Sequence, residues 1–338
     1  MKRRIGLIGL GFGAPAHARS LIDLSGRIDA IAASRTQERC DTFSARYDLP
    51  TTTDIDGLFE DPDVSALVIV TPPDTHLALV ERAAAAGKHI LLDKPLATTT
   101  PDAAKVVEVT RKAGVKLGVV LQERFRESSL HARELIESGA LGEIGMATVS
   151  VPWWRAQSYY DEPGRGTYAR DGGGVLITQA IHLIDLFQHL TGGIAEVAAI
   201  AARTALHDLE AEDFVAAGLM LTNGAPGNLL ATTALYPGAS DRIEIVGTRG
   251  TAILIGEWLE VHYQDGRKET AGNPPEEGGL SANTAEMSHK PHRGVITDFL
   301  DALDEDRDPG VTGKEILQVH RVIDALLESG REGRKISI

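Results

Sequence analysis

The sequence predicts an α/β protein of two domains, on three observations. The chain has 338 residues, more than one hydrophobic core usually supports. Its first third alternates short aliphatic runs with amphipathic stretches, the pattern of a parallel sheet covered by helices. Beyond about residue 123, longer β-type runs follow one another. We therefore expect a parallel-sheet domain over residues 1–122 and an α+β domain with a large, mainly antiparallel open sheet over residues 123–338.

The elements of the first domain follow from hydrophobic periodicity. Aliphatic runs predict the strands, and the amphipathic segments between them predict the helices. The expected strands are residues 4–9, 28–34, 66–71, 89–93 and 116–121, and the expected helices are residues 17–24, 37–47, 77–86 and 101–113. Right-handed crossovers between such elements build a doubly wound parallel sheet.

The second domain is predicted to begin with a helix and to continue as a sheet. Turn signals at Asn223-Gly224 and over 247–250 separate its strand-like runs. The expected helices are residues 129–138, 295–303 and 314–327, the expected strands are residues 144–151, 197–204, 213–221, 228–235, 242–246 and 251–261, and the expected loop is 272–279. The C-terminal helix could pack back on the first domain.

Composition limits the kind of partner. The formal net charge of -14 would repel nucleic acid and anionic lipid, so a small-molecule ligand is expected. Cys40 is the only cysteine and cannot form an intramolecular disulfide, and no apolar run is long enough to cross a bilayer. We expect a soluble, cytoplasmic protein with no nucleic-acid or membrane partner.

The first residues, MKRRIGLIGLGFGAPAHA, admit two interpretations. Basic residues, an apolar run and Ala14-Pro15-Ala16 look like an export signal with its cleavage site. Gly9, Gly11 and Ala14 behind a strand instead match the phosphate loop of a Rossmann-type domain. Cleavage after Ala16 would remove the first strand of the predicted sheet. The sequence therefore favours a retained segment that binds a dinucleotide.

Two parts of the first domain are predicted to hold the cofactor. In the loop, Gly9 permits a tight turn and Gly11 a close approach of the pyrophosphate, and the next helix directs its N–H groups at the phosphates. Phe12 and Gly13 complete this loop. The second strand ends in Ser34-Arg35-Thr36 with no carboxylate, and these groups suit a ribose 2′-phosphate. NADP is the expected cofactor, and NAD with a solvated Arg35 is the alternative.

Two further strand ends are expected to line the cofactor site, because open parallel sheets bind ligands at the carboxyl ends of their strands. Polar residues follow the third predicted strand in Thr71-Pro72-Pro73-Asp74-Thr75-His76 and the fourth in Asp93-Lys94-Pro95. The predicted cofactor contacts here are Thr71, Pro72, His76, Asp93, Lys94 and Gln122.

These segments, with the glycine run Gly172-Gly173-Gly174 and the His182 that follows it, resemble the oxidoreductase family of glucose-fructose oxidoreductase and inositol dehydrogenase (Gfo/Idh/MocA) over essentially the whole chain. The resemblance implies that Lys94 and His182 are catalytic. Many members carry Asp where this sequence has Thr178, so a relay through that carboxylate is missing here. Proton transfer is left to His182 and Lys94.

Aromatic and basic residues after residue 151 also resemble a branch of that family acting on sugar derivatives. Aromatic faces pack on sugar rings, and Arg or Tyr groups hydrogen-bond hydroxyls. The predicted substrate contacts are Lys94, Trp154, Arg155, Tyr160, Arg165, Thr178 and His182. Trp153 is equally consistent with a core or interface position.

The expected activity is hydride transfer between NAD(P) and a secondary alcohol or ketone of a sugar, sugar derivative or cyclitol. His182 would act as the base on the hydroxyl, and Lys94 would share or relay its proton. Alternatives are an NAD-dependent glycoside-cleaving enzyme, a dihydrodiol dehydrogenase and a noncatalytic dinucleotide or sugar sensor.

Two further expectations concern assembly and metals. An exposed face of an open sheet is costly in water, and the family packs such faces together, so we expect a homodimer or homotetramer through the C-terminal sheet. Glu286, His289 and His292 have spacings that suit a metal on a helix, but Pro291 interrupts that helix. No metal is expected.

Overall fold

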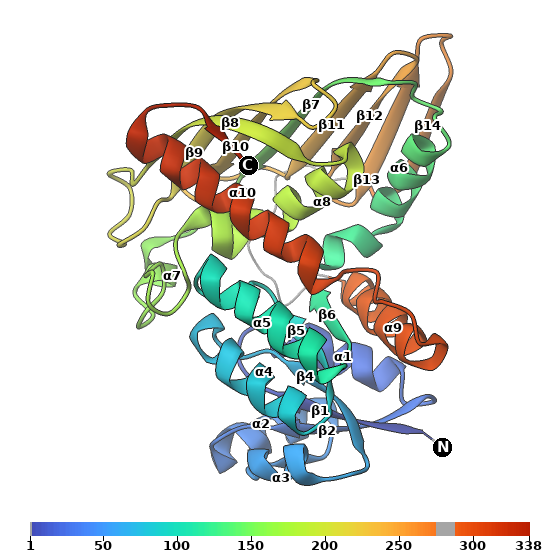
Figure 1. Cartoon of the computed structure of the whole chain (residues 1–338), viewed down its shortest axis with the longest axis vertical. Coiled ribbons are helices and arrows are strands. Elements are labelled where there is room, and N and C mark those ends of the chain that lie inside the picture. The colour runs from blue at the N-terminus through green and yellow to red at the C-terminus, as the bar shows by residue number, and fades with distance from the viewer. Residues whose placement is uncertain (1, 275–287) are drawn as a thin grey trace. The chain divides into compact units, whose positions relative to one another are not determined.

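The computed structural model of the chain describes residues 2–274 and 288–338 (Figure 1). These residues form two compact units. The first contains residues 2–122 and 288–317, and the second contains residues 123–274 and 318–338. Residues 288–317 thus group with the first unit, whereas the expected second domain runs without interruption from residue 123 to the end of the chain.

The first unit is built on a six-stranded sheet in the order β3-β2-β1-β4-β5-β6, with every neighbouring pair parallel. The predicted parallel sheet is therefore confirmed. Its strands are β1 (Arg3–Ile8), β2 (Ile28–Ala33), β3 (Thr51–Thr52), β4 (Val64–Ile69), β5 (His89–Asp93) and β6 (Leu117–Val120). The central β1 pairs with both β2 and β4, so the opening segment lies within the sheet. The two-residue β3 was not predicted, because so short a strand has no periodicity.

Helices of the first unit begin and end at residues that suit helix termini. Thr99 caps α5 by accepting a hydrogen bond from Asp102 N at 3.2 Å, and Gly114 ends it with a φ of +69°. The helices are α1 (Ala14–Asp23), α2 (Gln37–Tyr47), α3 (Ile55–Glu60), α4 (His76–Ala85), α5 (Thr100–Ala113) and α9 (Lys290–Glu305). Asp23 on α1 accepts hydrogen bonds from His289 and Arg293 at 2.9 and 2.8 Å, which attaches α9 to this unit.

The second unit contains a nine-stranded sheet in the order β14-β13-β12-β11-β7-β10-β9-β8-β15. All neighbours are antiparallel except β7 and β10, so the prediction of a mainly antiparallel sheet is confirmed. Its strands are β7 (Ile144–Pro152), β8 (Ile194–Ala202), β9 (Phe214–Leu221), β10 (Pro226–Thr232), β11 (Arg242–Gly247), β12 (Gly250–Ile255), β13 (Trp258–Tyr263), β14 (Lys268–Gly272) and β15 (Ile336–Ser337).

Two expectations for this sheet were wrong. The single strand expected over 251–261 is a hairpin of β12 and β13, because Gly256 adopts a φ of +57° and reverses the chain. Gly272 was expected to begin a loop but ends β14, a short strand that lacks a clear apolar alternation. Residues 275–279 of that expected loop lie outside the described residues.

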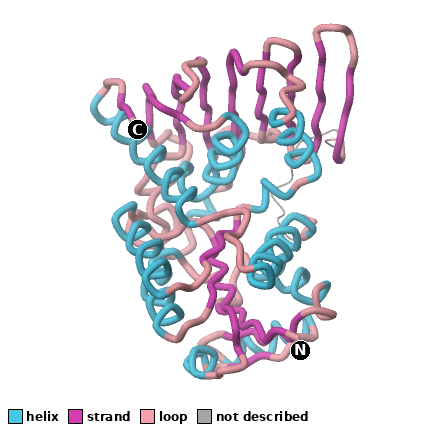
Figure 2. The backbone as a smooth tube through the Cα atoms, turned by 45° about the vertical axis from the view of Figure 1, so that its right-hand side comes forward, coloured by secondary structure: helices cyan, strands magenta, loops and turns pink. Residues whose placement is uncertain are grey.

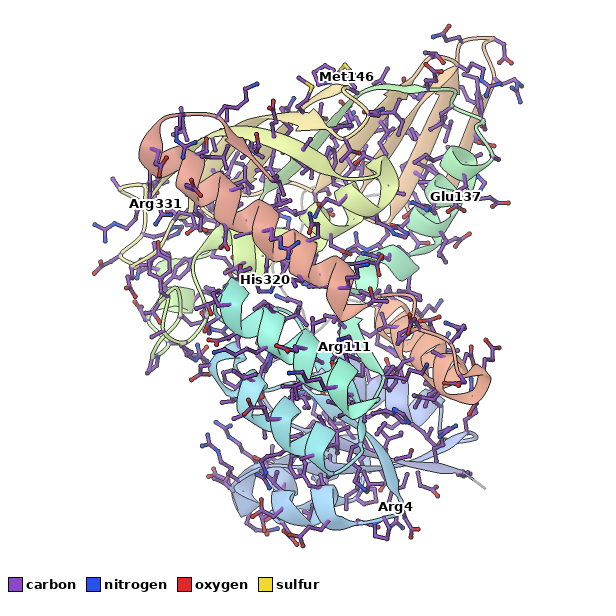
Figure 3. The ribbon with its side chains drawn as sticks, in the orientation of Figure 1. Arg4, Arg111, Glu137, Met146, His320 and Arg331 are labelled. Carbon is purple, nitrogen blue, oxygen red and sulfur yellow. The ribbon has the colours of Figure 1, made fainter. Side chains whose placement is uncertain are left out.

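Helices α6 (Glu127–Glu137), α8 (Ile181–Thr191) and α10 (Gly313–Glu332) cover one face of this sheet (Figures 1 and 2). Strand residues facing them are buried, such as Val149 and Ile243, and their neighbours along the strand are more exposed. On the opposite face Ile200 is 67% exposed, and Met146 (Figure 3) is 40% exposed. The alternation of apolar and polar residues that predicted the strands is therefore explained by a sheet with one face covered by helices.

Candidate active site

The loop between β1 and α1 has the geometry of a phosphate-binding turn. Gly9 has a φ of +102°, and a Cβ there would lie 2.5 Å from the Val70 carbonyl oxygen. A Cβ on Gly13 would lie 3.0 Å from the Val70 side chain and 3.4 Å from the Asp93 carboxylate. A Cβ on Gly11 would meet no atom within 4 Å. Gly9 and Gly13 thus permit close packing inside the protein, whereas Gly11 borders open space that suits a pyrophosphate.

The N-terminus of α1 is available to an anion. Gly13 occupies the capping position and supplies no side-chain acceptor for the N–H groups of the first turn. Pro15 lies in that turn, where its missing N–H costs nothing. Phe12, at the tip of the loop, is 67% exposed. This arrangement fits the phosphates of a dinucleotide.

The end of β2 presents a hydroxyl and a guanidinium as the sequence predicts. Ser34 is buried, and its N–H donates to the Thr52 carbonyl oxygen at 3.2 Å. Arg35 and Thr36 are exposed. Thr36 precedes α2 without capping it through its side chain. The Arg35 and Thr36 side chains are therefore accessible at the carboxyl edge of the sheet, whereas that of Ser34 is not.

His76 links the two strand-end loops of the first unit. Its Nε2 lies 2.9 Å from the Thr71 carbonyl oxygen, and its Nδ1 lies 2.9 Å from the Pro95 carbonyl oxygen. The side chain is fully buried, and this burial lowers the pKa of His76. His76 was expected to contact the cofactor. Because both ring nitrogens are engaged in the interior, we assign it instead to holding the loops of Thr71 and Lys94 together.

The remaining predicted cofactor contacts of this unit lie at the same carboxyl edge of the sheet. Thr71 shares a 2.6 Å hydroxyl hydrogen bond with Thr75, and Pro72 is exposed beside it. Asp93 accepts a hydrogen bond from Lys94 N at 2.9 Å, and both residues are half-buried at the end of β5. Gln122 is half-buried and begins the short helix η2 (Gln122–Phe125) after β6.

The glycine run of the second unit allows a helix to start against a strand. A Cβ on Gly174 would lie 1.8 Å from the Glu212 carbonyl oxygen, and Gly173 has a φ of +148°. The Glu212 carboxylate accepts hydrogen bonds from Gly174 N and Leu176 N at 3.2 and 3.1 Å. Burial raises the pKa of Glu212. These contacts fix the start of the helix that carries His182.

His182 and Thr178 share the accessible side of this helix. The chain first makes a π-helical turn, η3 (Leu176–Ala180), and then continues as α8. Among residues 173–187, only Thr178 and His182 are half-buried and all others are buried. The Thr178 hydroxyl donates to the Gly174 carbonyl oxygen at 2.6 Å, so this position holds a neutral group. π-Helical turns of this kind occur frequently at functional sites.

Arg124 and Asp185 form a buried ion pair that sequence reasoning missed. The guanidinium donates from Nε to Oδ2 at 2.7 Å and from Nη2 to Oδ1 at 2.5 Å. The two side chains are 5% and 1% exposed. The pair joins η2 to α8, three residues beyond His182, and so fixes the helix that presents the imidazole. The only signal in the sequence was the position of Asp185, three residues after His182, from which it could orient another group.

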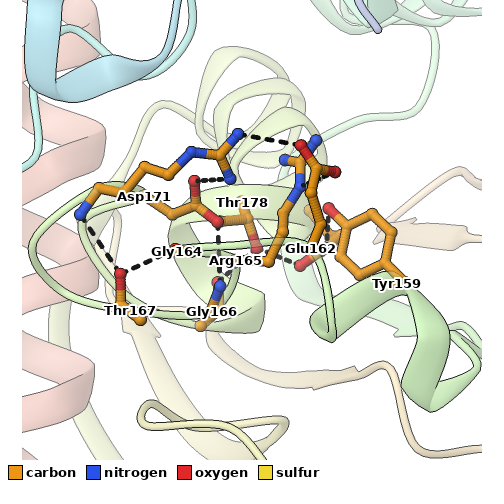
Figure 4. Close-up of polar contacts among 11 residues, drawn as sticks. Tyr159, Glu162, Gly164, Arg165, Gly166, Thr167, Asp171 and Thr178 are labelled. Atoms are coloured by element: carbon orange, nitrogen blue, oxygen red, sulfur yellow. Dashed lines mark hydrogen bonds and ion pairs between the residues drawn. The ribbon is translucent and has the colours of Figure 1, made fainter.

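The loop over 159–171 contains two of the predicted substrate residues, Tyr160 and Arg165, and Arg165 takes part in a polar network there (Figure 4). The Arg165 guanidinium lies over the Tyr159 ring at 5.0 Å and donates to Glu162 at 3.1 Å. The Gln179 amide donates to the Tyr159 hydroxyl at 3.3 Å and also contacts Thr178. The loop is therefore connected by side chains to the start of the His182 helix.

Tyr160 differs from its expected role. Its hydroxyl lies 2.6 Å from the Thr233 hydroxyl, and burial raises its pKa to about 12. Its ring packs on His207 at 4.9 Å. Because the hydroxyl is engaged in the interior, we assign Tyr160 to supporting the loop, with no direct contact to substrate.

His207 is a supporting residue that the sequence did not reveal. Its Nδ1 lies 2.8 Å from Asp213 Oδ2, and its Nε2 lies 2.8 Å from the Arg155 carbonyl oxygen. The imidazole and the carboxylate are both fully buried. Trp154 stacks at a tilt on His207 at 5.4 Å and contacts the ring of the exposed Tyr236. His207 thus holds the backbone of the segment that carries Trp154 and Arg155.

Histidines suspected of metal binding have other partners. His289 pairs with Asp23, and Glu286 lies outside the described residues. Over residues 2–274 and 288–338, no group of three or more His, Cys, Asp or Glu side chains is arranged to hold a metal ion. In the same residues, no helix combines the length and apolar character needed to span a membrane.

Both halves of the chain match models of known protein domains. Residues 3–121 match the oxidoreductase family with an NAD-binding Rossmann fold, and residues 129–253 match the GFO/IDH/MocA C-terminal domain. The fold and the phosphate loop thus define a dinucleotide-binding oxidoreductase. The chain belongs to the Gfo/Idh/MocA family of oxidoreductases.

Individual relatives cover the whole chain. Inositol 2-dehydrogenase of Rhizobium meliloti is 26% identical over 345 residues, with 100% of each chain covered. The WlbA dehydrogenase of Bordetella pertussis, solved with NADH and UDP-GlcNAcA, is 29% identical with a TM-score of 0.83, and covers 100% of this chain and 99% of its own. Levoglucosan dehydrogenase, solved with NADH and levoglucosan, has a TM-score of 0.87 at 24% identity, with 100% of each chain covered, and shares the fold.

Proposed function

We propose that this oxidoreductase transfers hydride between NAD(P) and a secondary alcohol or ketone of a sugar, sugar derivative or cyclitol. The observation that carries the proposal is the Gly9–Gly13 loop, whose open side at Gly11 fits a pyrophosphate. Support comes from the relatives, which include an inositol dehydrogenase and a WlbA dehydrogenase bound to NADH and a nucleotide sugar acid.

In this proposal Lys94 and His182 move the proton of the reacting alcohol. The bound nicotinamide ring supplies or accepts the hydride. During oxidation the His182 imidazole would accept the hydroxyl proton, and Lys94, hydrogen-bonded to the same oxygen, would share or relay that proton as a neutral amine. The neutral Thr178 supplies no carboxylate for the relay and is left to hydrogen-bond a substrate hydroxyl.

We further propose NADP as the preferred cofactor. The Arg35 guanidinium and the Ser34 and Thr36 hydroxyls would bind a ribose 2′-phosphate, and no carboxylate in 34–36 would repel it. Replacing Arg35 with Ala should raise the KM for NADP at least about tenfold and leave that for NAD nearly unchanged, since one charged hydrogen-bonding pair is worth about 1.5–3 kcal/mol. Equal KM values of the wild type for both cofactors would refute the preference.

The uncovered face of the second sheet supports a proposed homodimer or homotetramer. On this face Leu230 is paired with Ala216, and Ala216 is paired with the exposed Ile200. A row of apolar residues on one sheet face is typical of an interface between copies. The single Cys40 supports a cytoplasmic location as part of the same proposal.

A screen of cofactor reduction tests the activity. Free sugars, glycosides, nucleotide sugars and inositols are offered with NAD or NADP, and absorbance at 340 nm is recorded. A dehydrogenase gives net reduction of the cofactor. A glycoside-cleaving enzyme gives a cleaved product without net reduction, and a dihydrodiol dehydrogenase or a sensor gives no reduction with any of these compounds, so either outcome would replace the proposal.

A further inference from the structure

The Arg155 guanidinium lies over two aromatic rings, just beyond the end of β7. Its guanidinium carbon is 5.5 Å from the centre of the Trp153 ring and 5.6 Å from that of Tyr159. The side chain is half-buried, and Nη1 donates to the Trp154 carbonyl oxygen at 3.2 Å. A guanidinium stacked on ring faces keeps its in-plane N–H groups directed outward, where they can form a bidentate contact with an anion.

The backbone of Arg155 is fixed on both sides. Its N–H donates to the Thr233 carbonyl oxygen at 2.9 Å, and its carbonyl oxygen lies 2.8 Å from His207 Nε2. His207 is in turn held by the buried Asp213. The backbone of Arg155 is therefore held in place before any ligand arrives, which reduces the entropy lost on binding.

Arg155 differs from its basic neighbours in how its guanidinium is paired with carboxylates. Arg165 is paired with Glu162 at 3.1 Å, and Arg170 contacts Glu162 and Asp171 at 3.2 and 3.4 Å. Within the described part of the chain, no Asp or Glu oxygen lies within 4.0 Å of a nitrogen of Arg155. A half-buried guanidinium with no carboxylate partner among the described residues is unusual in a chain with a net charge of -14.

Two like charges also meet on the Tyr159 ring. The guanidinium carbons of Arg155 and Arg165 lie 5.6 and 5.0 Å from its centre. The Tyr159 hydroxyl is joined to Gln179, which precedes the His182 helix. The Arg155 guanidinium is thus connected, through Tyr159 and Gln179, to the start of the helix that carries the proposed catalytic base.

We infer that Arg155 is an anion subsite, and that the substrate is an acidic sugar derivative carrying a carboxylate or phosphate group. The inference rests on the proposed sugar dehydrogenase activity and narrows its substrate class. Arg155 binds two oxygens of the anion through its outward N–H groups, and Trp153 and Tyr159 hold the guanidinium in place. The uncharged hydroxyls of the sugar are left to other groups of the site.

Matched substrates test the inference in the full-length protein. Glucuronate, glucose 6-phosphate and UDP-glucose are each compared with glucose by cofactor reduction, in wild type and in Arg155→Gln. Wild type should prefer at least one anionic compound to glucose. The kcat/KM for that compound, divided by the kcat/KM for glucose, should be at least about tenfold lower in Arg155→Gln than in wild type. A preferred glucuronate indicates a carboxylate ligand, whereas a preferred phosphate or UDP compound indicates a phosphate ligand.

Two further variants separate recognition of charge from a structural effect. Arg155→Lys keeps the positive charge but loses the paired N–H donors of the guanidinium. Its preference for the anionic sugar should therefore lie between those of wild type and Arg155→Gln. Arg170→Gln removes a charge from the same loop at a paired position and should leave the preference for the anionic sugar unchanged. A similar preference for glucose and the acids in wild type, or an equal loss for both in Arg155→Gln, would overturn the inference.

A binding measurement keeps this inference separate from the proposed activity. Titration of the NADP-loaded protein with glucuronate, glucose 6-phosphate, UDP-glucose or glucose is followed by calorimetry and by the fluorescence of the nearby Trp153. If no compound is turned over but an anionic compound binds through Arg155, the proposed activity fails and the anion subsite stands. If sugars are turned over but the anionic compounds bind no more tightly to wild type than to Arg155→Gln, the anion subsite is wrong and the proposed activity stands.

Discussion

Replacing Asp185 with Asn should strongly destabilise the second unit. Asp185 and Arg124 form two hydrogen bonds of 2.7 and 2.5 Å, and their side chains are 1% and 5% exposed. The Asn side chain keeps the shape but removes the negative charge, so the Arg124 charge stays buried without this carboxylate. Breaking one partner of a buried pair costs about 3–5 kcal/mol, and we expect a loss of that size in the free energy of unfolding.

Tryptophan fluorescence during urea unfolding measures this loss in the correct unit, because all three tryptophans of the chain lie in the second unit. Asp265→Asn, which removes an exposed partner of Arg267, is the control and should leave the transition unchanged. The double variant Arg124→Leu with Asp185→Leu should be less destabilised than Asp185→Asn, since it leaves no buried charge of the pair. A single variant as stable as wild type would refute our account of how the His182 helix is held.

Three further predictions follow from the glycines, the buried histidines and the open sheet face. Gly9→Ala should lower the melting temperature of the first unit, because Gly9 has a φ of +102° and its Cβ would lie 2.5 Å from the Val70 carbonyl oxygen. Gly11→Ala should leave the melting temperature unchanged and weaken dinucleotide binding. Equal effects of the two substitutions would contradict the assigned roles. Burial lowers the pKa of His17 and of His320 from 6.5 to about 4, so their neutral forms stabilise the fold fully above pH 6.5, and about 3 kcal/mol each is lost as pH falls from 6.5 to about 4. In urea titrations between pH 4 and 7, His17→Leu should therefore reduce the loss of stability in acid, and an unchanged pH dependence would count against its burial as the cause. Leu230→Asp should lower the mass in solution measured by light scattering, and a monomeric wild type would end the proposed assembly.

The parallel sheet and the phosphate loop were predictable because local sequence controls them. The aliphatic runs of β1, β4 and β5 are buried on both faces, and a fully buried strand gives a continuous hydrophobic signal. The hairpin at Gly256 was missed because β12 and β13 are both apolar, so one turn residue is the only local sign of the reversal.

The supporting residues of the site depend on contacts between distant parts of the sequence. Arg124 and Asp185 are 61 residues apart, and His207 holds a carbonyl oxygen 52 residues away. Neither pair has a spacing that a sequence pattern could reveal. The buried state of the Tyr160 hydroxyl and the His76 ring was equally hidden, since an aromatic or histidine side chain suits both an interior and a binding position.

In the proposed reaction, Lys94 and His182 move the proton of the alcohol that is oxidised. Single-turnover reduction of the cofactor at 340 nm, with the best substrate of the screen and saturating dinucleotide, measures this step in wild type, Lys94→Ala and His182→Ala. We predict that both variants bind the dinucleotide and that each slows reduction by at least about a hundredfold, the usual contribution of a general acid or base. Reduction at the wild-type rate in both variants would contradict the claim.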